Sequence, residues 1–218
     1  ERMSSNLPEA VHGGIVPALS LIDPTTGVAM LEGIFGFVVV EVGPADQITL
    51  ALGDQNIIIG HKGPFVGSAR PHHLALSVPD IGKAMSEIIA KGGRLASSMT
   101  PDGPLEIPEF WASGVRYVFF EGPEGVLIEL CMKLDPSEKS TWGHDHIGIE
   151  CENIADVRAS FLAAGCNVLA EHELIRSNGV TSVCFLGRNG SVVELFRPPD
   201  VNPTICNTSR SFWSGCVI

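Results

Sequence analysis

Two histidines and two glutamates occupy places in this 218-residue sequence where their side chains could act together. His73 and His146 each lie near the start of an alternating, strand-like run, and Glu129 and Glu194 each lie inside an apolar one. Burying a carboxylate in an apolar strand is costly unless a cation or hydrogen-bond donors compensate for it. The glutamates follow their histidines by 56 and 48 residues, so the same pair of residue types recurs in the same order.

A divalent metal would compensate for both buried carboxylates at once. Imidazole nitrogen and carboxylate oxygen form a mixed ligand set that suits Ni²⁺, Zn²⁺, Co²⁺, Mn²⁺ or Fe²⁺. Four protein ligands in an octahedral sphere leave two positions for water or a bidentate substrate. A carboxylate beside a metal-bound carbonyl can move a proton as a general base. We therefore predict that His73, Glu129, His146 and Glu194 bind the metal, and that Glu194 and Glu129 are the candidate catalytic residues.

Each of these residues also has an ordinary structural interpretation when it is taken alone. A single histidine at this place in a strand is commonly a strand-end residue without a metal. Basic side chains close by are alternative partners for the carboxylates: Arg116 or Lys133 for Glu129, and Arg197 for Glu194. The metal hypothesis depends on the repetition of the pattern.

The elements that would position these residues occur twice. In the first unit, residues 72–78 alternate as a strand, and residues 81–91 place apolar side chains at helical spacing. Val115–Glu121 and Val126–Lys133 have the composition of strands, and Gly122-Pro-Glu-Gly125 between them is typical of a hairpin turn. Glu129 is thus expected in the last strand of this unit.

The same order returns 73 residues later in a second unit. Asp145–Glu150 alternates as a strand, Ile154–Ala164 is predicted to be a helix, and three strands are predicted at Asn167–Leu174, Thr181–Leu186 and Ser191–Phe196. Each unit therefore has the order strand, helix, three strands. The repetition predicts a similar fold for both units.

A fainter third copy precedes these two units. Its elements are predicted at Ile15–Ile22 (strand), Asp23–Phe35 (helix), and Phe37–Val42, Gln47–Leu52 and Asn56–His61 (strands). The alternative is an N-terminal extension that covers a sheet edge.

The predicted boundaries follow from this division. Residues 1–70 form a degenerate βαβββ-like module whose matching places, near Val16 and Gly60, lack metal ligands. Residues 71–138 form a module with the first half of the metal site. Residues 139–218 form a module with the second half and an irregular tail from Pro198.

The repeated pattern resembles the vicinal oxygen chelate superfamily. The matching segments are His73-Leu-Ala-Leu with Val126-Leu-Ile-Glu129, and His146-Ile-Gly-Ile with Val192-Val-Glu194. The resemblance covers about residues 72–197. It implies an α+β fold in which tandem βαβββ modules pair into a metal-binding cup. Members include glyoxalase I, methylmalonyl-CoA epimerase, extradiol dioxygenases and antibiotic-binding proteins of the bleomycin resistance type.

Within this superfamily, the His-Glu-His-Glu set is most similar to bacterial glyoxalase I and the epimerases. That similarity implies a divalent-metal-dependent isomerase, epimerase or lyase, which removes a proton next to a metal-bound carbonyl of a small oxygenated substrate, and it favours Glu194 as the base. Ser77 and Lys133 stand where glyoxalase I carries an Arg and an Asn for glutathione, so we do not expect glutathione dependence.

Two other functions stay open at this point. One is an Fe(II)-dependent ring-cleaving dioxygenase that uses His73, His146 and Glu194. The other is a ligand-sequestering resistance or binding protein of the same fold.

Several residues near the predicted ligands are weaker candidates. Glu150 shares the face of His146, but an exposed strand-end charge is the simpler interpretation. His72 and His144 are expected to flank the site, because alternation sends adjacent side chains to opposite faces. Cys131 should line the cup as a buried, inert thiol. The segment Ser97–Gly114, with three prolines and a Phe-Trp pair that we expect to be exposed, is predicted to close over the cup.

Composition restricts the partners. A formal net charge of −11 disfavours nucleic acid, and the longest apolar run, Ile34–Val40, is far too short to cross a membrane. The six cysteines have no CxxC spacing, which indicates free thiols and a cytoplasmic protein. We expect a small-molecule substrate and a homodimer.

Overall fold

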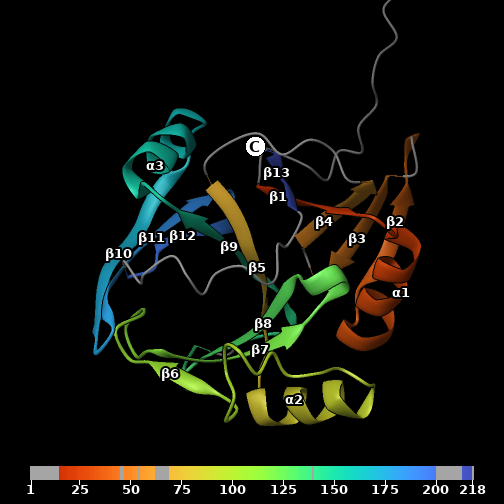
Figure 1. The fold of residues 1–218 in the computed structure, drawn as a ribbon, viewed down its shortest axis with the longest axis horizontal. Coiled ribbons are helices and arrows are strands. Elements are labelled where there is room, and N and C mark those ends of the chain that lie inside the picture. The colour runs from red at the N-terminus through yellow and green to blue at the C-terminus, as the bar shows by residue number, and fades with distance from the viewer. Residues whose placement is uncertain are drawn as a thin grey trace, which may run out of the picture.

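The structure is a computed structural model that describes residues 15–44, 47–53, 55–61, 69–138, 140–199 and 213–217. Its strands and helices fall into three successive groups along the chain, followed by one further strand near the C-terminal end. Figure 1 shows these elements in order of colour.

The first group has the order strand, helix, three strands. Its elements are β1 (Val16–Leu21), α1 (Pro24–Phe35), β2 (Val38–Val42), β3 (Ile48–Leu52) and β4 (Gln55–His61). Helix α1 begins after Asp23, whose carboxylate accepts a hydrogen bond from the Thr26 backbone N–H, and it ends at Gly36 in the left-handed conformation. These local signals lie close to the ends that the sequence predicts.

The second group contains β5 (Ala69–Ser77), α2 (Ile81–Ala90), β6 (Leu105–Ile107), β7 (Val115–Glu121) and β8 (Leu127–Lys133). The predicted turn between the last two strands is a short 3₁₀ helix, η2 (Pro123–Gly125). The third group contains β9 (Gly143–Cys151), α3 (Ile154–Ala163), β10 (Asn167–Arg176), β11 (Gly179–Arg188) and β12 (Ser191–Arg197). The last strand is β13 (Trp213–Val217).

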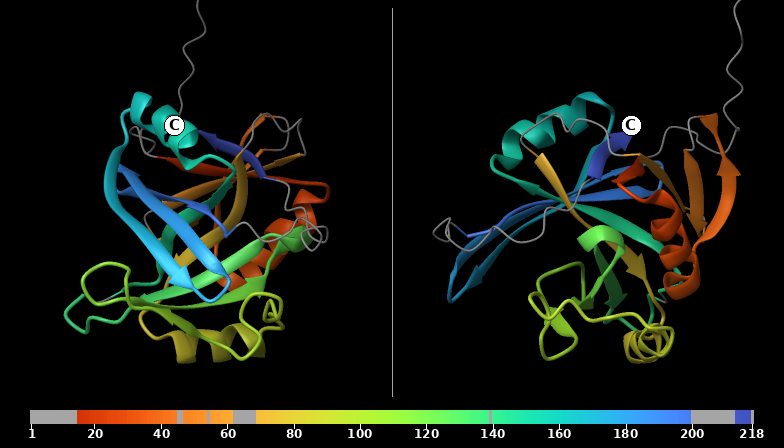
Figure 2. Two further views of the ribbon diagram at one scale, coloured as in Figure 1. Left: turned by 60° about the vertical axis from the view of Figure 1, so that its left-hand side comes forward. Right: turned by 45° about the vertical axis from the view of Figure 1, so that its right-hand side comes forward.

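The strands form two sheets, which Figure 2 shows from two sides. The smaller sheet has the order β13-β1-β4-β3-β2, and the larger one has the order β10-β11-β12-β9-β5-β8-β7-β6. The first and last strands of each group are parallel neighbours: β1 with β4, β5 with β8, and β9 with β12. Strands β5 and β9 then pair antiparallel and join the second and third groups into one curled sheet. The predicted α+β class with paired βαβββ units is confirmed.

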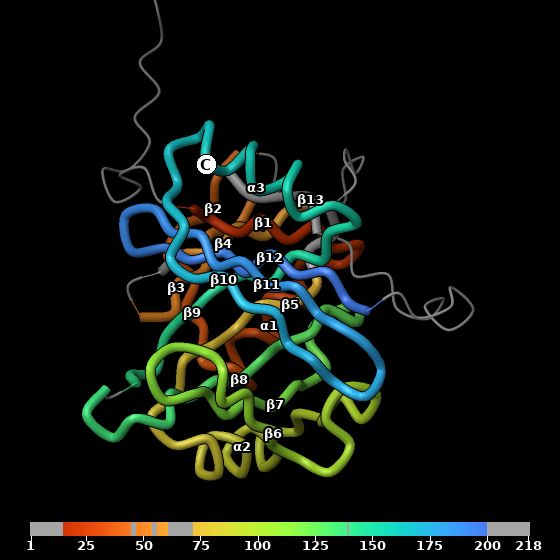
Figure 3. The backbone as a smooth tube through the Cα atoms, turned by 90° about the vertical axis from the view of Figure 1, so that its left-hand side faces the viewer, coloured from red at the N-terminus to blue at the C-terminus, as the bar shows by residue number. Residues whose placement is uncertain are grey.

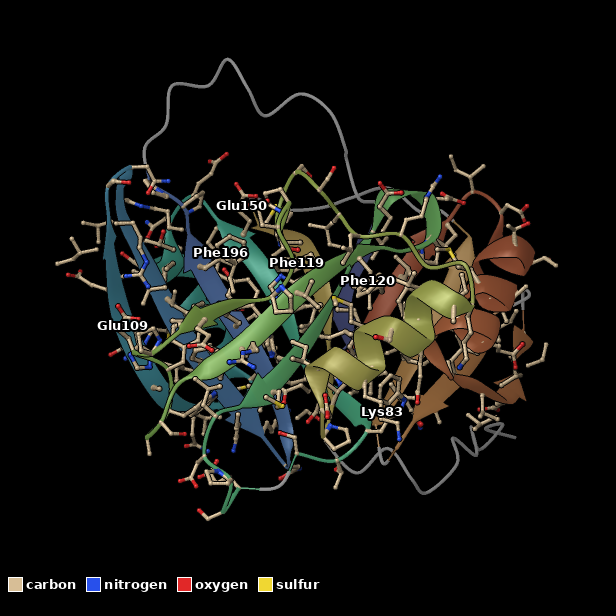
Figure 4. All side chains as sticks on the ribbon, turned by 90° about the horizontal axis from the view of Figure 1, so that it is seen from below. Lys83, Glu109, Phe119, Phe120, Glu150 and Phe196 are labelled. Carbon is tan, nitrogen blue, oxygen red and sulfur yellow. The ribbon has the colours of Figure 1, made fainter. Side chains whose placement is uncertain are left out.

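Aliphatic side chains fill the core between the helices and the sheets. Helix α2 buries Ile81, Ala84 and Ile88 in this core, and Phe120 of β7 packs in the same cluster. The neighbouring residue on β7, Phe119, belongs to the opposite face of the sheet, which Figure 4 shows with both rings labelled. One face of the large sheet therefore packs in the hydrophobic core, and the other face is available for a site.

The predicted irregular tail from Pro198 needs a correction. Strand β13 forms there and pairs antiparallel with β1, so it becomes the edge of the smaller sheet. Its sequence contains Gly215, which weakens the local preference for a strand. The strand depends on its antiparallel pairing with β1, which the local sequence does not predict.

None of the helices among the described residues has the length and apolar character needed to span a bilayer.

Candidate metal centre

The four predicted ligands lie on the four central strands of the large sheet, β8, β5, β9 and β12. Their side chains fall in two adjacent cross-strand rows: Glu129, Ala75 and His146 in one row, and Glu194, Gly148 and His73 in the other. Each row thus places a small residue between a glutamate and a histidine. The parallel pairing inside each unit and the antiparallel contact between units generate this arrangement, which relates the two rows by an approximate twofold axis.

The ligand atoms of the four side chains converge on one point. His73 Nε2 lies 2.9 Å from Glu129 Oε2, 3.3 Å from Glu194 Oε2 and 3.1 Å from His146 Nε2. His146 Nε2 lies 3.1 Å from Glu194 Oε2 and 3.7 Å from Glu129 Oε2. A shared proton can bridge one of these pairs at a time, whereas a single cation can contact all four atoms.

These separations fit the coordination sphere of a transition metal. With metal–ligand bonds of about 2.0–2.2 Å, neighbouring ligands are about 2.8–3.1 Å apart in an octahedron and about 3.3–3.6 Å apart in a tetrahedron. The observed distances run from 2.9 to 3.7 Å, and only the longest, between His146 Nε2 and Glu129 Oε2, lies slightly above these ranges. The donor set and its geometry therefore suit the divalent metals that the residue types predict.

All four residues are buried, with 3–9% of their surface exposed. Burial alone would lower the pKa of His73, but Glu129 and Glu194 outweigh it and raise that pKa. Burial likewise opposes protonation of His146, yet Asp145 and Glu194 hold its pKa well above the usual range. Burial would raise the pKa of Glu194, but its hydrogen bonds with His146 and His73 lower it. The cluster therefore attracts positive charge to its centre.

The alternative pairing predicted for Glu129 is not what the structure shows. Arg116 forms an ion pair with Glu106, and Lys133 lies 2.6 Å from Glu138. The buried carboxylate of Glu129 therefore relies on the two histidines for compensation.

The outer nitrogen of each histidine also has a partner, and both partners immediately precede their histidine in the sequence. The Nδ1 atoms of His72 and His73 share a hydrogen bond of 2.9 Å, and His146 Nδ1 lies 2.8 Å from Asp145 Oδ1. Such contacts place the Nδ1 proton of a histidine and leave its Nε2 free for a metal.

Two β-bulges bring these partners to the site. The register between β5 and β9 skips His72 on one strand and Asp145 on the other. A bulged residue leaves the regular alternation of faces, so His72 lies beside His73 instead of opposite it. His72 flanks the cluster without belonging to it, as predicted, but the expectation that its side chain lies on the opposite face from His73 was wrong. Burial and repulsion from His73 lower the pKa of His72 to about 3, which keeps its ring neutral.

Gly148 makes the close approach of the histidines possible. A Cβ at this position would overlap the His73 imidazole. Gly148 was not among the predicted site residues, although both units share a small residue two places after the histidine, Ala75 in one and Gly148 in the other.

Asp145 gives a specific prediction. Replacing it with Ala should lower the affinity for Co²⁺ or Zn²⁺ by about 10–100-fold, because outer-sphere partners of liganding histidines have effects of this size. The Asp145→Asn variant, which keeps an acceptor oxygen, should retain more of the affinity than Asp145→Ala. Competition against a chromophoric chelator measures both. Affinities within twofold of the parent in both variants would show that Asp145 has no part in metal binding.

Cys131 lies beside this outer partner. Cys131, Asp145 and His146 each place one ligand atom within 4.8 Å of the others. Burial, together with Asp145 and Glu129, raises the pKa of the Cys131 thiol well above its usual range. Metals bind the thiolate form, so we assign the trio to hydrogen bonding. This environment agrees with the expected buried, inert thiol.

The cluster opens into a cavity of about 970 Å³. Its lining includes the four candidate ligands, His72, Asp145 and many aromatic side chains, but not Glu150. The predicted exposure of Phe110 was wrong: this ring is 5% exposed and packs against Phe185. The loop between α2 and β7 therefore forms part of the cavity wall.

In the N-terminal group of elements, β1 to β4, the register places Ile58 of β4 beside Ala18 of β1. This pair corresponds to Glu129 beside Ala75, if Val16 is the counterpart of His73. Ile58 is thus a better match than Gly60 for the glutamate position, and the expectation that this unit lacks ligands at these places is unchanged.

Comparison with known proteins relates this architecture to solved structures. No protein-family model matches the sequence, and no curated protein sequence matches it. A variant of glyoxalase I from Zea mays has a TM-score of 0.62 and 15% identity, and the match covers 94% of this chain and 73% of that one. Another structure of glyoxalase I from Zea mays has a TM-score of 0.60 and 16% identity, with coverage of 86% and 67%. At this identity the likeness shows the fold, and it confirms the predicted resemblance at that level.

Proposed function

We propose that this chain, which has the vicinal oxygen chelate fold, binds a divalent metal and catalyses proton transfer next to a carbonyl group of a small oxygenated substrate. The reaction class is an isomerisation, epimerisation or lyase reaction. The observation that carries the proposal is the convergence of two imidazole nitrogens and two carboxylate oxygens within 4.8 Å of one another, with the imidazole nitrogens 2.9–3.7 Å from the other ligand atoms, all on buried residues that line one cavity.

His73, Glu129, His146 and Glu194 would hold the metal, which is Ni²⁺, Zn²⁺, Co²⁺, Mn²⁺ or Fe²⁺. When bound, the metal supplies a Lewis acid that acidifies the C–H next to a carbonyl. The protein's own contribution is to take up that proton and return it, either to the same carbon or to its neighbour.

Glu194 is our first candidate for the base, and Glu129 is the second. Glu194 lines the cavity, and its contacts with both histidines keep it in the anionic form that accepts a proton. Its Oε2 atom lies 3.1–3.3 Å from the two imidazoles, and its other carboxylate oxygen would accept the proton.

Glutathione is not part of this proposal. Lys133, which stands at one of the two places considered for glutathione, is held by Glu138 and lies 5.7 Å from the centre of the Trp111 ring. Ser77 stands at the other place and carries no charge.

We also propose that residues 1–70, 71–138 and 139–218 are the three modules of the chain. On this view the second and third contribute the ligands, and the first has a structural role.

Elemental analysis of the purified protein, followed by a screen for deuterium exchange, tests the function. We expect about one divalent metal ion per chain, and exchange into the C–H next to the carbonyl of at least one α-oxygenated carbonyl compound. A chelator should stop the exchange, and added metal should restore it. Absence of bound metal, or oxygen uptake with a catechol after anaerobic reconstitution with Fe²⁺, would contradict the proposal.

A further inference from the structure

Half of the aromatic residues of this protein surround one cavity. The sequence contains ten Phe, three Trp and one Tyr, and seven of these fourteen line the cavity above the metal cluster. They are Trp142 and six residues that form a wall: Phe110, Trp111, Tyr117, Phe119, Phe185 and Phe196. Aliphatic residues account for most of the core, so this concentration of rings belongs to the cavity.

The wall continues directly from the metal cluster. The ring centroid of Phe119 lies 5.3 Å from that of His73, and Phe196 lies 6.3 Å from the same imidazole. Phe185 lies 6.0 Å from His146 on the other side. Phe119 lies on β7 and Phe196 on β12, and both are labelled in Figure 4. A substrate whose carbonyl reaches the cluster must therefore place its adjoining atoms against aromatic faces.

The loop that contains β6 completes the wall by bridging the two units. Phe110 and Trp111 pack on Phe185 at centroid distances of 5.1 and 4.9 Å. Next to them, the Arg176 guanidinium donates hydrogen bonds of 2.8 and 3.1 Å to the Glu109 carboxylate. In Figure 3 this loop and the β10–β11 hairpin lie on the same side of the molecule. The ion pair thus connects the loop of one unit to strand β10 of the other unit.

The charges around the cavity disfavour an anionic substrate. Of the described residues that line it, only Lys133 and Arg176 carry a permanent positive charge, and each is paired with a carboxylate, Glu138 and Glu109 respectively. The lining also includes the carboxylates of Glu129, Glu194 and Asp145, and that of Glu106, which is paired with Arg116. One metal ion would neutralise part of this charge and leave no excess of positive charge.

We infer that the substrate is an uncharged α-oxygenated carbonyl compound whose carbonyl carries a flat aromatic group. The oxygens would lie at the metal cluster, and the aromatic group would lie between the rings of the loop and those of β7, β11 and β12. This inference rests on the proposed function for the position of the carbonyl, and on the wall and the charges for the rest. A cavity of about 970 Å³ holds such a molecule easily.

Calorimetric titration of three probes tests the inference on metal-loaded and metal-free protein. The probes are 2-hydroxyacetophenone, hydroxyacetone and the para-carboxylate of 2-hydroxyacetophenone. We expect 2-hydroxyacetophenone to bind at least about tenfold more tightly than either of the others, because it alone combines ring contacts with zero charge. The preference over hydroxyacetone should persist without metal.

Two variants locate the binding. Trp111→Ala, in the loop, should weaken binding of 2-hydroxyacetophenone by about fivefold and leave that of hydroxyacetone unchanged. Ile175→Ala, at a side chain 74% exposed outside the cavity, is the matched control and should change neither.

The outcomes separate this inference from the proposed function. Equal or tighter binding of hydroxyacetone or of the carboxylate probe, or no binding of any probe, overturns the aromatic substrate class, whether or not deuterium exchange is found. Selective binding of 2-hydroxyacetophenone in a protein that binds no metal supports the substrate class and overturns the proposed reaction.

Discussion

Replacing His146 with alanine should lower the affinity for Co²⁺ or Zn²⁺ by about 1,000-fold. The change removes a ligand nitrogen that lies 3.1 Å from both Glu194 Oε2 and His73 Nε2, and it leaves Asp145 without its partner. Loss of an outer partner of a liganding histidine lowers metal affinity by about 10–100-fold, and the loss of a ligand atom together with its outer contact should exceed that range. Competition titration against a chromophoric chelator measures the effect.

His172→Ala is the matched control for this variant. His172 lies on β10, stacks on Phe110 at a centroid distance of 5.1 Å, and does not belong to the cluster. Its loss should change metal affinity by less than about twofold. Thermal unfolding of both variants without metal shows whether each is folded. A folded His146→Ala protein that binds metal as the parent does would remove the basis of the proposed function.

The second large effect is expected at Glu194. The Glu194→Gln variant should lower the rate of deuterium exchange by about 10²–10⁴-fold, which is the range for loss of a general base. The amide keeps the size of the side chain and an oxygen that can bind a metal, but it cannot accept the proton. Metal content should therefore fall less than the exchange rate, and elemental analysis at saturating metal separates the two effects.

Glu129→Gln provides the comparison, because it makes the same chemical change in the other row of the site. We expect its exchange rate to fall by less than about tenfold if Glu194 is the base. The opposite ranking of the two variants would assign the base to Glu129. Losses of similar size in both would indicate that the carboxylates act together.

The order of the elements was predictable from local patterns. Alternation in 72–78 and in Asp145–Glu150, the helical spacing of apolar residues in 81–91, and the turn at Gly122-Pro-Glu-Gly125 each depend on a few neighbouring residues. These signals do not require knowledge of the tertiary contacts. They are therefore visible in the sequence, and the strands and helices form close to the expected places.

The grouping of the four candidate ligands was also predictable, because the chain repeats. A buried glutamate follows a strand-end histidine in both units, and the same pairing of first and last strands then puts each glutamate beside the second residue after its histidine. Because both units have the same order of elements, they are expected to adopt the same fold. The repetition therefore predicts equivalent positions for the two His-Glu pairs without any knowledge of long-range contacts.

The outer partners of the histidines were not predictable by the same reasoning. His72 and Asp145 reach the site only because β5 and β9 each carry an extra residue in their shared register. A bulge depends on the hydrogen bonds between two strands that are 73 residues apart, and regular alternation predicts the wrong face for a bulged side chain. The overlap that a Cβ at Gly148 would cause has the same long-range origin.

The sequence by itself determined the repeated units, their strands and helices, and the four residues that could share a metal. Only the tertiary structure decided which side chains support those four and what kind of cavity lies above them. The burial of Phe110, the Glu109–Arg176 ion pair and the pairing of β13 with β1 all join segments that are distant in the chain. Local sequence encodes periodicity and turns, whereas contacts between separate units depend on how the sheet curls.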